Sequence, residues 1–227
     1  MNEAAVAAPR PRWERRKQAR PAELLAAALA LFVERGYAGT RLEDVAARAG
    51  VSKGTLYLYF ANKEELFKAV VRENIVRNIA EGRERVAAHE GATAELLAAM
   101  LRQWWERVGQ TPASGITKLV LAESGNFPEI ARFYVDEVIE PAHRLLAGVI
   151  ERGIRRGEFR RVDVPTFVRV LTAPMVMLLL WRHSFDACCH AAIDPQRYVE
   201  AHIDATLAAL RGTPTTTRAR SARGRRP

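Results

Sequence analysis

Residues 40–66 read TRLEDVAARAGVSKGTLYLYFANKEEL and carry three successive signals for the start of a helix. Thr40 and Asn62 are each followed three residues later by Glu, which is the spacing of a capping box, where the first side chain accepts a hydrogen bond from a backbone N–H. Ser52 stands between them, directly before a short helical segment that its hydroxyl can cap. The stretch therefore predicts three consecutive helix starts.

The first two of these helices are predicted at residues 41–49 and 53–60, and only Gly50-Val51-Ser52 separates them. Glycine readily adopts the left-handed conformation that ends a helix. Two short helices joined by a three-residue turn that contains glycine predict a helix-turn-helix.

The predicted helix at residues 53–60 has two different faces. Leu56 and Phe60 are four residues apart, so we expect both to pack inward. The opposite face carries hydroxyl, ammonium and phenol groups, on Ser52, Lys53, Gly54, Thr55, Tyr57 and Tyr59. Such groups suit a DNA surface, because they donate to phosphates and base edges, and the helix N-terminus adds unpaired N–H groups that favour a phosphate. The alternative is a small solvated helix in an α-helical bundle.

Helical periodicity continues on both sides of this stretch, and no window of alternating β-branched residues stands out. Further helices are expected at residues 21–35, 63–88, 93–108, 116–124, 128–156, 164–185 and 195–211, with a break at Pro141 as an alternative. The expected fold class is all-α, with an N-terminal helix-turn-helix domain of three helices, a larger C-terminal helical bundle and about nine helices in all.

Residues 21–67 resemble the DNA-binding domain of the tetracycline-repressor (TetR) family of transcriptional regulators. The resemblance is carried by Gly36-Tyr37, Thr40, AGVSKGTLY at residues 49–57, Tyr59-Phe60 and Lys63-Glu64, all at the family's spacing. It implies a ligand-responsive regulator, most commonly a repressor. In such proteins ligand binding moves the helix that joins the sensor to the DNA reader, here residues 63–88, and so lowers DNA affinity.

Carried over by position, the resemblance also implies which residues meet DNA. It implies phosphate contacts from Thr40, Tyr57, Tyr59 and Lys63. It implies base-edge or phosphate contacts from Arg41, Ser52, Lys53 and Thr55. Arg41 departs from the small hydroxyl residue that is commoner at its position, which leaves open whether it reaches a guanine or a phosphate.

A single recognition helix can touch only three or four base pairs, which is too little to select one site in a genome. We therefore expect a homodimer that reads a palindromic operator in double-stranded DNA, with half-sites about 34–36 Å apart. The C-terminal helices at 164–185 and 195–211 are the candidates for the dimer interface. The alternative is that both belong to the intramolecular core.

The chain beyond residue 66 is too long for a DNA reader alone, so we expect a sensor for a small, largely apolar effector. Pockets for such ligands are lined by large adaptable side chains. The candidates are Trp104, Trp105, Phe133, Phe167, Met175, Met177 and Trp181. Each of them could equally belong to the core, because aromatic residues at helical spacing usually do.

The net charge of +9 is concentrated at the two ends of the 227 residues. Residues 1–20 hold six basic and two acidic residues, and residues 212–227 hold five arginines and no acid. The predicted organisation is a basic arm at 1–20, the helix-turn-helix domain at 21–66, a sensing and dimerisation domain at 67–211 and a disordered basic tail at 212–227. Basic arms seek polyanions, so a nonspecific nucleic-acid-binding protein is the alternative function.

Other classes find little support in the sequence. Two adjacent cysteines, Cys188 and Cys189, exclude a disulfide framework and favour a reducing compartment, and their redox activity or metal binding stays open. The most apolar stretch, 170–181, is too short to span a membrane and is expected to be a buried helix in a cytoplasmic protein. No nucleophile elbow, phosphate loop or HExxH motif is present, so we expect neither an enzyme nor a cofactor or metal site.

Overall fold

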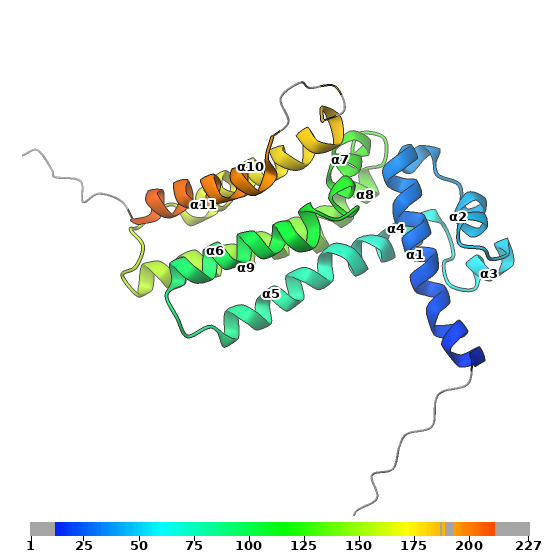
Figure 1. The fold of residues 1–227 in the computed structure, drawn as a ribbon, viewed down its shortest axis with the longest axis horizontal. Coiled ribbons are helices and arrows are strands. Elements are labelled where there is room, and N and C mark those ends of the chain that lie inside the picture. Colours follow the sequence, from blue (N-terminus) through cyan, green and yellow to red (C-terminus); the bar gives the residue numbers. More distant parts are fainter. Residues whose placement is uncertain (1–11, 187, 189–192, 212–227) are drawn as a thin grey trace, which may run out of the picture.

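The computed structural model describes residues 12–186, 188 and 193–211, giving only the backbone for residues 12–20. All regular secondary structure in these ranges is helical, as predicted. Figure 1 shows an elongated molecule in which a small head at one end carries the N-terminal helices and long antiparallel helices form the rest. The predicted basic tail at 212–227 and part of the predicted basic arm, residues 1–11, lie outside the described residues.

The head consists of α1 (Arg12–Gly39), α2 (Leu42–Arg48), α3 (Lys53–Tyr57) and α4 (Lys63–Val71). Helix α1 begins nine residues before the predicted start at Pro21, because the helix continues backward through that proline. Helix α3 ends three residues earlier than predicted. Helix α4 begins at the predicted residue.

The body continues α4 without a break and contains three short π-helical turns, labelled η. Its elements are η1 (Arg72–Val76), α5 (Arg77–Ala88), α6 (Thr93–Trp104), η2 (Trp105–Gly109), α7 (Ser114–Glu123), α8 (Pro128–Tyr134), η3 (Val135–Ile139), α9 (Glu140–Arg155), α10 (Val164–Ser184) and α11 (Pro195–Arg211). With each π turn counted as part of the helix around it, the described residues form nine continuous helices, which matches the predicted number.

The expected break near Pro141 takes the form of a π turn instead. Turn η3 ends directly before Glu140, whose N–H donates to the carbonyl of Val135, five residues back. Pro141 has no N–H to donate, and it follows directly after this turn, where the hydrogen-bond pattern of the helix has already changed. The chain therefore passes the proline without leaving the helical path.

Two of the three predicted caps are confirmed. The Ser52 hydroxyl accepts from the N–H of Thr55 at 3.1 Å, and the Asn62 side chain accepts from the N–H of Glu65 at 2.9 Å. The capping box predicted at Thr40 is wrong. Arg41 occupies the cap position of α2 and makes no side-chain capping bond.

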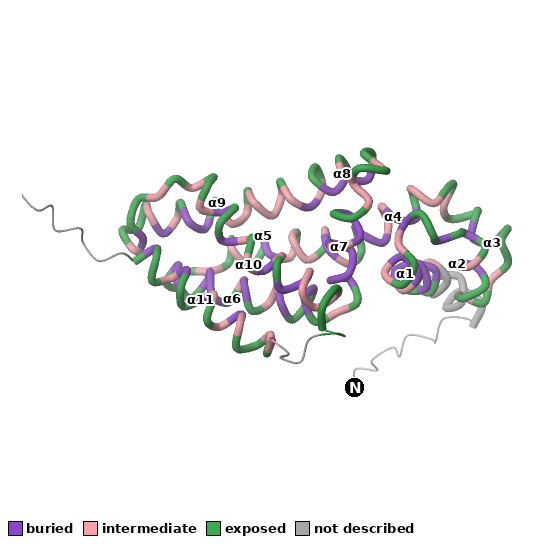
Figure 2. The backbone as a smooth tube through the Cα atoms, turned by 90° about the horizontal axis from the view of Figure 1, so that it is seen from above, coloured by how far each residue is buried: buried purple, intermediate pink, exposed green. Residues whose placement is uncertain are grey.

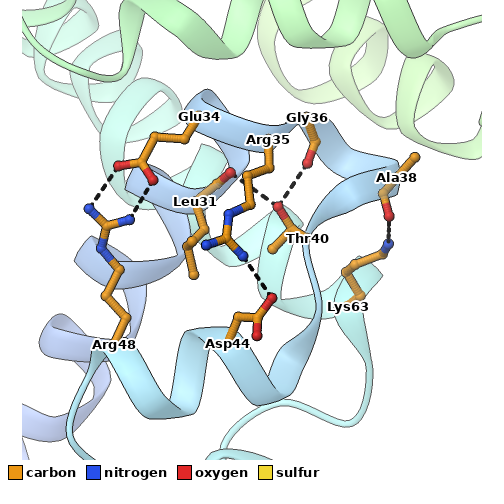
Figure 3. A network of polar contacts seen from close by, with 9 residues as sticks. All are labelled: Leu31, Glu34, Arg35, Gly36, Ala38, Thr40, Asp44, Arg48 and Lys63. Atoms are coloured by element: carbon orange, nitrogen blue, oxygen red, sulfur yellow. Dashed lines mark hydrogen bonds and ion pairs between the residues drawn. The ribbon is translucent and has the colours of Figure 1, made fainter.

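Thr40 instead joins α1 to α2 from inside the head. Its side chain is only 1% exposed, and its hydroxyl donates to the carbonyls of Gly36 at 2.8 Å and Leu31 at 3.1 Å (Figure 3). Gly36 breaks the helical path with φ +76°, a backbone conformation that residues other than glycine rarely adopt. The hydroxyl therefore holds the chain at the point where it turns away from α1.

Two exposed ion pairs span the same junction, Arg35 with Asp44 at 2.8 Å and Arg48 with Glu34 at 2.7 Å (Figure 3). Exposed pairs of this kind contribute little to stability. They link α1 to α2 at the surface, while the buried residues supply most of the packing energy.

The buried residues form two hydrophobic clusters, coloured purple along the inner faces of the helices in Figure 2. The first joins the head helices α1–α4 to α7 and α8, and it includes Phe32, Phe67, Ile116 and Phe133. The second joins α6, α9, α10 and α11. The head thus shares its core with the first part of the body, and packing does not divide the chain at residue 66.

Helix α10 differs from the expected buried helix. By length and composition it could cross a membrane, and only 28% of its most apolar stretch is buried in the structure. Leu171, Met175, Leu178 and Leu179 pack in the second cluster, while Val170 and Met177 are more than half exposed. One face of α10 is therefore a core face, and the other is apolar but uncovered.

The buried hydroxyl of Thr40 gives a direct stability test. Replacing Thr40→Val keeps the shape but removes the donor, leaving the carbonyls of Leu31 and Gly36 without it. We expect the free energy of unfolding to fall by about 1–2 kcal/mol, measured by urea denaturation. Thr40→Ser keeps the hydroxyl and should lose less. Equal stability of Thr40→Val and the wild type would contradict the role given to the hydroxyl.

Candidate nucleic-acid interface and effector pocket

Helix α3 presents the polar face that the sequence predicts. Leu56 is fully buried beneath it, and Phe60 packs partly against the same core. The outward side chains are exposed, namely Ser52, Lys53, Tyr57 and Tyr59, while Thr55 is half-buried. The Ser52 hydroxyl also lies 2.9 Å from the hydroxyl of Thr55. The cap that starts the helix therefore orients two of the hydroxyl groups on this face.

The ammonium group on this face has an acidic neighbour that the sequence analysis missed. Lys53 forms an ion pair with Glu43 of α2 and lies 5.8 Å from the ring centre of Tyr57. The pair raises the pKa of Lys53 and lowers the pKa of Glu43. A phosphate that approaches Lys53 must therefore compete with a carboxylate for the same cation.

Leu58 is a second feature of this surface that the sequence pattern did not predict. It follows α3 directly, between the two exposed tyrosines, and is 83% exposed. An exposed leucine beside hydroxyl and ammonium groups can make an apolar contact, such as with a thymine methyl group in a major groove. Its position within LYLY could have signalled this, because Leu56 already supplies the inward face.

Arg41 is exposed at the start of α2 and makes no side-chain capping bond. Thr40 and Lys63, two residues expected to bind phosphate, have intramolecular partners instead. The Lys63 ammonium donates to the carbonyl of Tyr37 at 2.8 Å. It also donates to the carbonyl of Ala38 at 3.3 Å (Figure 3). It also lies 4.5 Å from the centre of the Tyr37 ring.

Burial is the main cause of the pKa shifts of Lys63 and Tyr37. It lowers the pKa of Lys63 and raises the pKa of Tyr37 to about 12. The Tyr37 ring also contacts Phe32, Phe67 and Phe127, with ring centres 4.8–5.8 Å apart. In this structure Lys63 therefore fastens the start of α4 to the end of α1, and its charge faces the protein.

The body contains a cavity of about 470 Å³ between α5, α6, α7, α8, α9 and α10. Its wall is mostly apolar, and all three π turns contribute to it, through Ile75 of η1, Val108 of η2 and Val138 of η3. This volume lies within the usual range for small-molecule sites, about 300–1,000 Å³. The cavity can therefore hold a small, largely apolar molecule.

A few polar groups interrupt this apolar wall. The hydroxyl groups of Thr117 and Tyr134 lie 3.1 Å apart and are buried. Nε2 of His143 lies 3.4 Å from the hydroxyl of Thr172, and burial lowers the pKa of this histidine. Burial therefore favours the neutral form of His143, which presents a hydrogen-bonding group to the cavity.

The structure brings only two of the predicted pocket residues to the cavity wall, Trp104 and Met175. Trp105 and Phe133 are buried in the two hydrophobic clusters. Phe167 packs partly against the second cluster, Met177 is 54% exposed, and the ring of Trp181 contacts that of Phe185 in a tilted arrangement. The aliphatic part of the wall was missed, including Ile79, Val138, Ile139, Leu145 and Leu146.

The cysteine pair can be described only in part. Cys188 is exposed and its thiol lies 3.3 Å from the carbonyl of Phe185, whereas Cys189 and His190 lie outside the described residues. Within the described ranges no three His, Cys, Asp or Glu side chains gather in a way that could hold a metal ion.

Matches to family models cover most of the chain. Residues 24–70 match the model described as bacterial regulatory proteins of the tetR family. Residues 87–194 match the model described as a tetracyclin repressor-like C-terminal domain.

Curated relatives agree with these matches. The fatty acid metabolism regulator protein of Bacillus subtilis is 28% identical over 146 residues, which are 63% of this chain and 74% of the relative. The transcriptional repressor KstR2 of Rhodococcus jostii is 29% identical over 167 residues, which are 73% of this chain and 80% of the relative.

Solved structures show the same fold. The regulator FadR from Bacillus subtilis, in complex with stearoyl-CoA, superposes with a TM-score of 0.70 at 22% identity, covering 83% of this chain and 98% of the other. KstR2 of Mycobacterium tuberculosis, a ketosteroid transcriptional regulator, superposes with a TM-score of 0.65 at 23% identity, covering 86% of this chain. Both family models and these relatives lead to one conclusion: the chain belongs to the TetR family of transcriptional regulators.

Proposed function

We propose that this regulator is a repressor that binds a palindromic operator as a homodimer and is released by a small, largely apolar effector. The observation that carries the proposal is the exposed polar face of α3. The core beneath this face extends to α7 and α8, which also line an apolar cavity. Two relatives support it, since one is named a repressor and the other is a regulator solved with stearoyl-CoA.

In this proposal Ser52, Lys53, Tyr57 and Tyr59 meet the operator directly. Lys53 releases Glu43 to bind a phosphate or a guanine, and the tyrosine hydroxyls donate to phosphates. Arg41 contacts the DNA backbone or a base edge beside α3. Thr40 and Lys63 support this surface from within and do not themselves meet the phosphates.

The dimer is proposed to form through the uncovered faces of α10 and α11. Val170, Ala173 and Met177 follow one another along the exposed side of α10, and small residues, Ala201, Ala205 and Ala208, follow the exposed side of α11. A helix face that is apolar and exposed in one protomer is typical of an interface. A four-helix contact between two copies would cover α10, so this helix need not enter a membrane. A cytoplasmic location follows from access to the operator.

Selection of bound DNA from a random pool tests the function as a whole. We expect the selected sites to share a palindrome. Its half-sites would show specific binding by the helix-turn-helix, its symmetry would indicate a dimer, and its spacing would give the distance between the two recognition helices. Binding that depends steeply on salt but selects no sequence would instead support a nonspecific nucleic-acid-binding protein.

The pairing of Lys53 with Glu43 predicts opposite effects of two substitutions on operator affinity. Lys53→Ala should weaken binding about ten-fold or more and reduce the slope of log affinity against log salt by about one. Glu43→Gln should tighten binding a few-fold at low salt, because it frees the ammonium and removes a charge that repels phosphate. Fluorescence anisotropy with the selected operator measures both effects.

Arg77→Ala is the matched control for these variants, because Arg77 is exposed on α5, pairs with Glu73 and lies away from α3. It should bind the operator like the wild type. Unchanged affinity in Lys53→Ala would refute the role assigned to that residue.

The cavity predicts that filling it blocks ligand binding but not DNA binding. Ala142 lines the cavity from α9, and Ala142→Trp should reduce the fluorescence of bound Nile red, a neutral apolar dye, several-fold. Operator affinity should stay within two-fold of the wild type, roughly the error of such titrations. Arg144→Trp, which adds the same ring to the exposed side of α9, should leave the dye signal intact. Undiminished dye binding in Ala142→Trp would show that the dye binds elsewhere.

The dimer proposal predicts that charge on the exposed face of α10 separates the protomers. The double substitution Val170→Glu and Met177→Glu would bury four carboxylates in the proposed interface and should raise the dissociation constant of the dimer by about a hundred-fold or more. Sedimentation equilibrium measures this change. Ala87→Glu on the exposed side of α5 is the control. A double variant that stays dimeric at the same concentrations would place the interface elsewhere.

A further inference from the structure

The charged side chains that line the cavity are basic, and no acidic side chain among the described residues lines it with them. These side chains are Arg85 and Arg107. Arg107 is neutralised by an ion pair with Glu81 of α5. Arg85 makes no ion pair and no hydrogen bond with any residue that the structure describes, and its Nε is buried without a partner.

This arrangement leaves a strong donor facing an apolar space. A buried N–H of a charged group without an acceptor is unfavourable, because desolvation is not offset by a hydrogen bond. A guanidinium group offers several N–H donors in a planar fork that matches the two oxygens of a carboxylate or phosphate. The acceptor that Arg85 lacks within the protein is therefore one that a bound oxyanion would supply.

The backbone near Arg85 is fitted closely to the opposite wall. Gly82 lies one turn before Arg85, and a Cβ built there would lie 3.0 Å from Cδ2 of Leu145 and 4.0 Å from Nη2 of Arg85. The glycine lets α5 approach α9 at the point where the guanidinium meets the aliphatic wall. A charged group and an apolar surface are thus presented side by side to one occupant.

We propose that the effector is an amphipathic anion, whose carboxylate or phosphate binds the guanidinium of Arg85 while its apolar part fills the cavity. The inference rests on the proposed effector role of the cavity and adds the charge of the ligand to it. Because α5 continues through η1 into α4, an anion held by Arg85 binds directly to the helix that supports the DNA-binding head (Figure 1).

Three ligands with the same twelve-carbon chain test the proposal, namely dodecanoate, dodecyl phosphate and 1-dodecanol. Their binding to the full-length wild type, Arg85→Gln and Arg85→Lys is measured by calorimetry below the micelle concentrations. Arg85→Gln should lower the affinity for the favoured anion at least about ten-fold, as expected for the loss of a charge-assisted hydrogen bond. Its affinity for dodecanol should stay unchanged. Arg85→Lys, which keeps the charge but not the fork, should lose less than Arg85→Gln. The preferred anion identifies the source as a carboxylate or a phosphate.

Arg83→Gln is the matched control, because Arg83 is exposed on the same helix and does not line the cavity. It should bind all three ligands like the wild type. The proposal is overturned if Arg85→Gln binds both anions as tightly as the wild type, or if its affinity for dodecanol falls as much as its affinity for the anions. It is also overturned if neither anion binds the wild type below 1 mM, roughly the weak limit of specific binding.

Operator binding by the same preparations separates this inference from the proposed function. If the wild type selects a palindrome but neither anion binds, the inference fails and the regulator function stands. If no specific DNA is bound, the proposed function fails whatever the ligands do.

Discussion

One continuous helix, residues 63–88, joins the DNA-binding head to the cavity in the body. Its first part, α4, starts at the Asn62 cap and buries Leu66, Phe67, Val70 and Val71 in the head's core. Its second part, α5, forms a wall of the cavity. Because α4 runs through the π turn η1 into α5 without leaving the helical path, a displacement of α5 can reach the head along one continuous element. The shared cluster of α1 with α7 and α8 supplies a second connection of the same kind.

The three π turns give the cavity its form. Each adds one residue to a helical turn and redirects the side chains that follow, and each places at least one side chain in the cavity wall, such as Ile75, Val108 or Val138. Such turns are rare and often mark functional sites in helical proteins. All three turns contribute side chains to the wall, so local backbone geometry as well as side-chain size bears on the shape of the cavity.

Local rules predicted what local interactions determine, and they failed where a distant partner competes. The caps at Ser52 and Asn62 form as expected because their acceptors meet N–H groups three residues away. The same rule failed at Thr40, since its hydroxyl donates to carbonyls of α1 after Gly36 turns the chain back. The pocket shows a similar limit: Trp104 lines the cavity while its neighbour Trp105 lies in the core, and only the packing of whole helices decides which face each one enters. The helices, the turn and the exposed face of α3 were thus predictable, whereas the cavity wall was not.

In the proposed mechanism, the effector must distinguish between two states of the protein. A ligand that binds both states equally shifts neither, and moving an equilibrium from 1:99 to 99:1 requires about a 10⁴-fold preference. Apolar contacts alone distinguish poorly between states, because an aliphatic wall can repack around the same occupant. A directional bond to α5 does so better, since its geometry is lost when the helix moves, and Arg85 offers such a bond within the described residues. The coupling can then reach the operator through α4 by changing the distance between two heads, while the face of α3 itself stays intact.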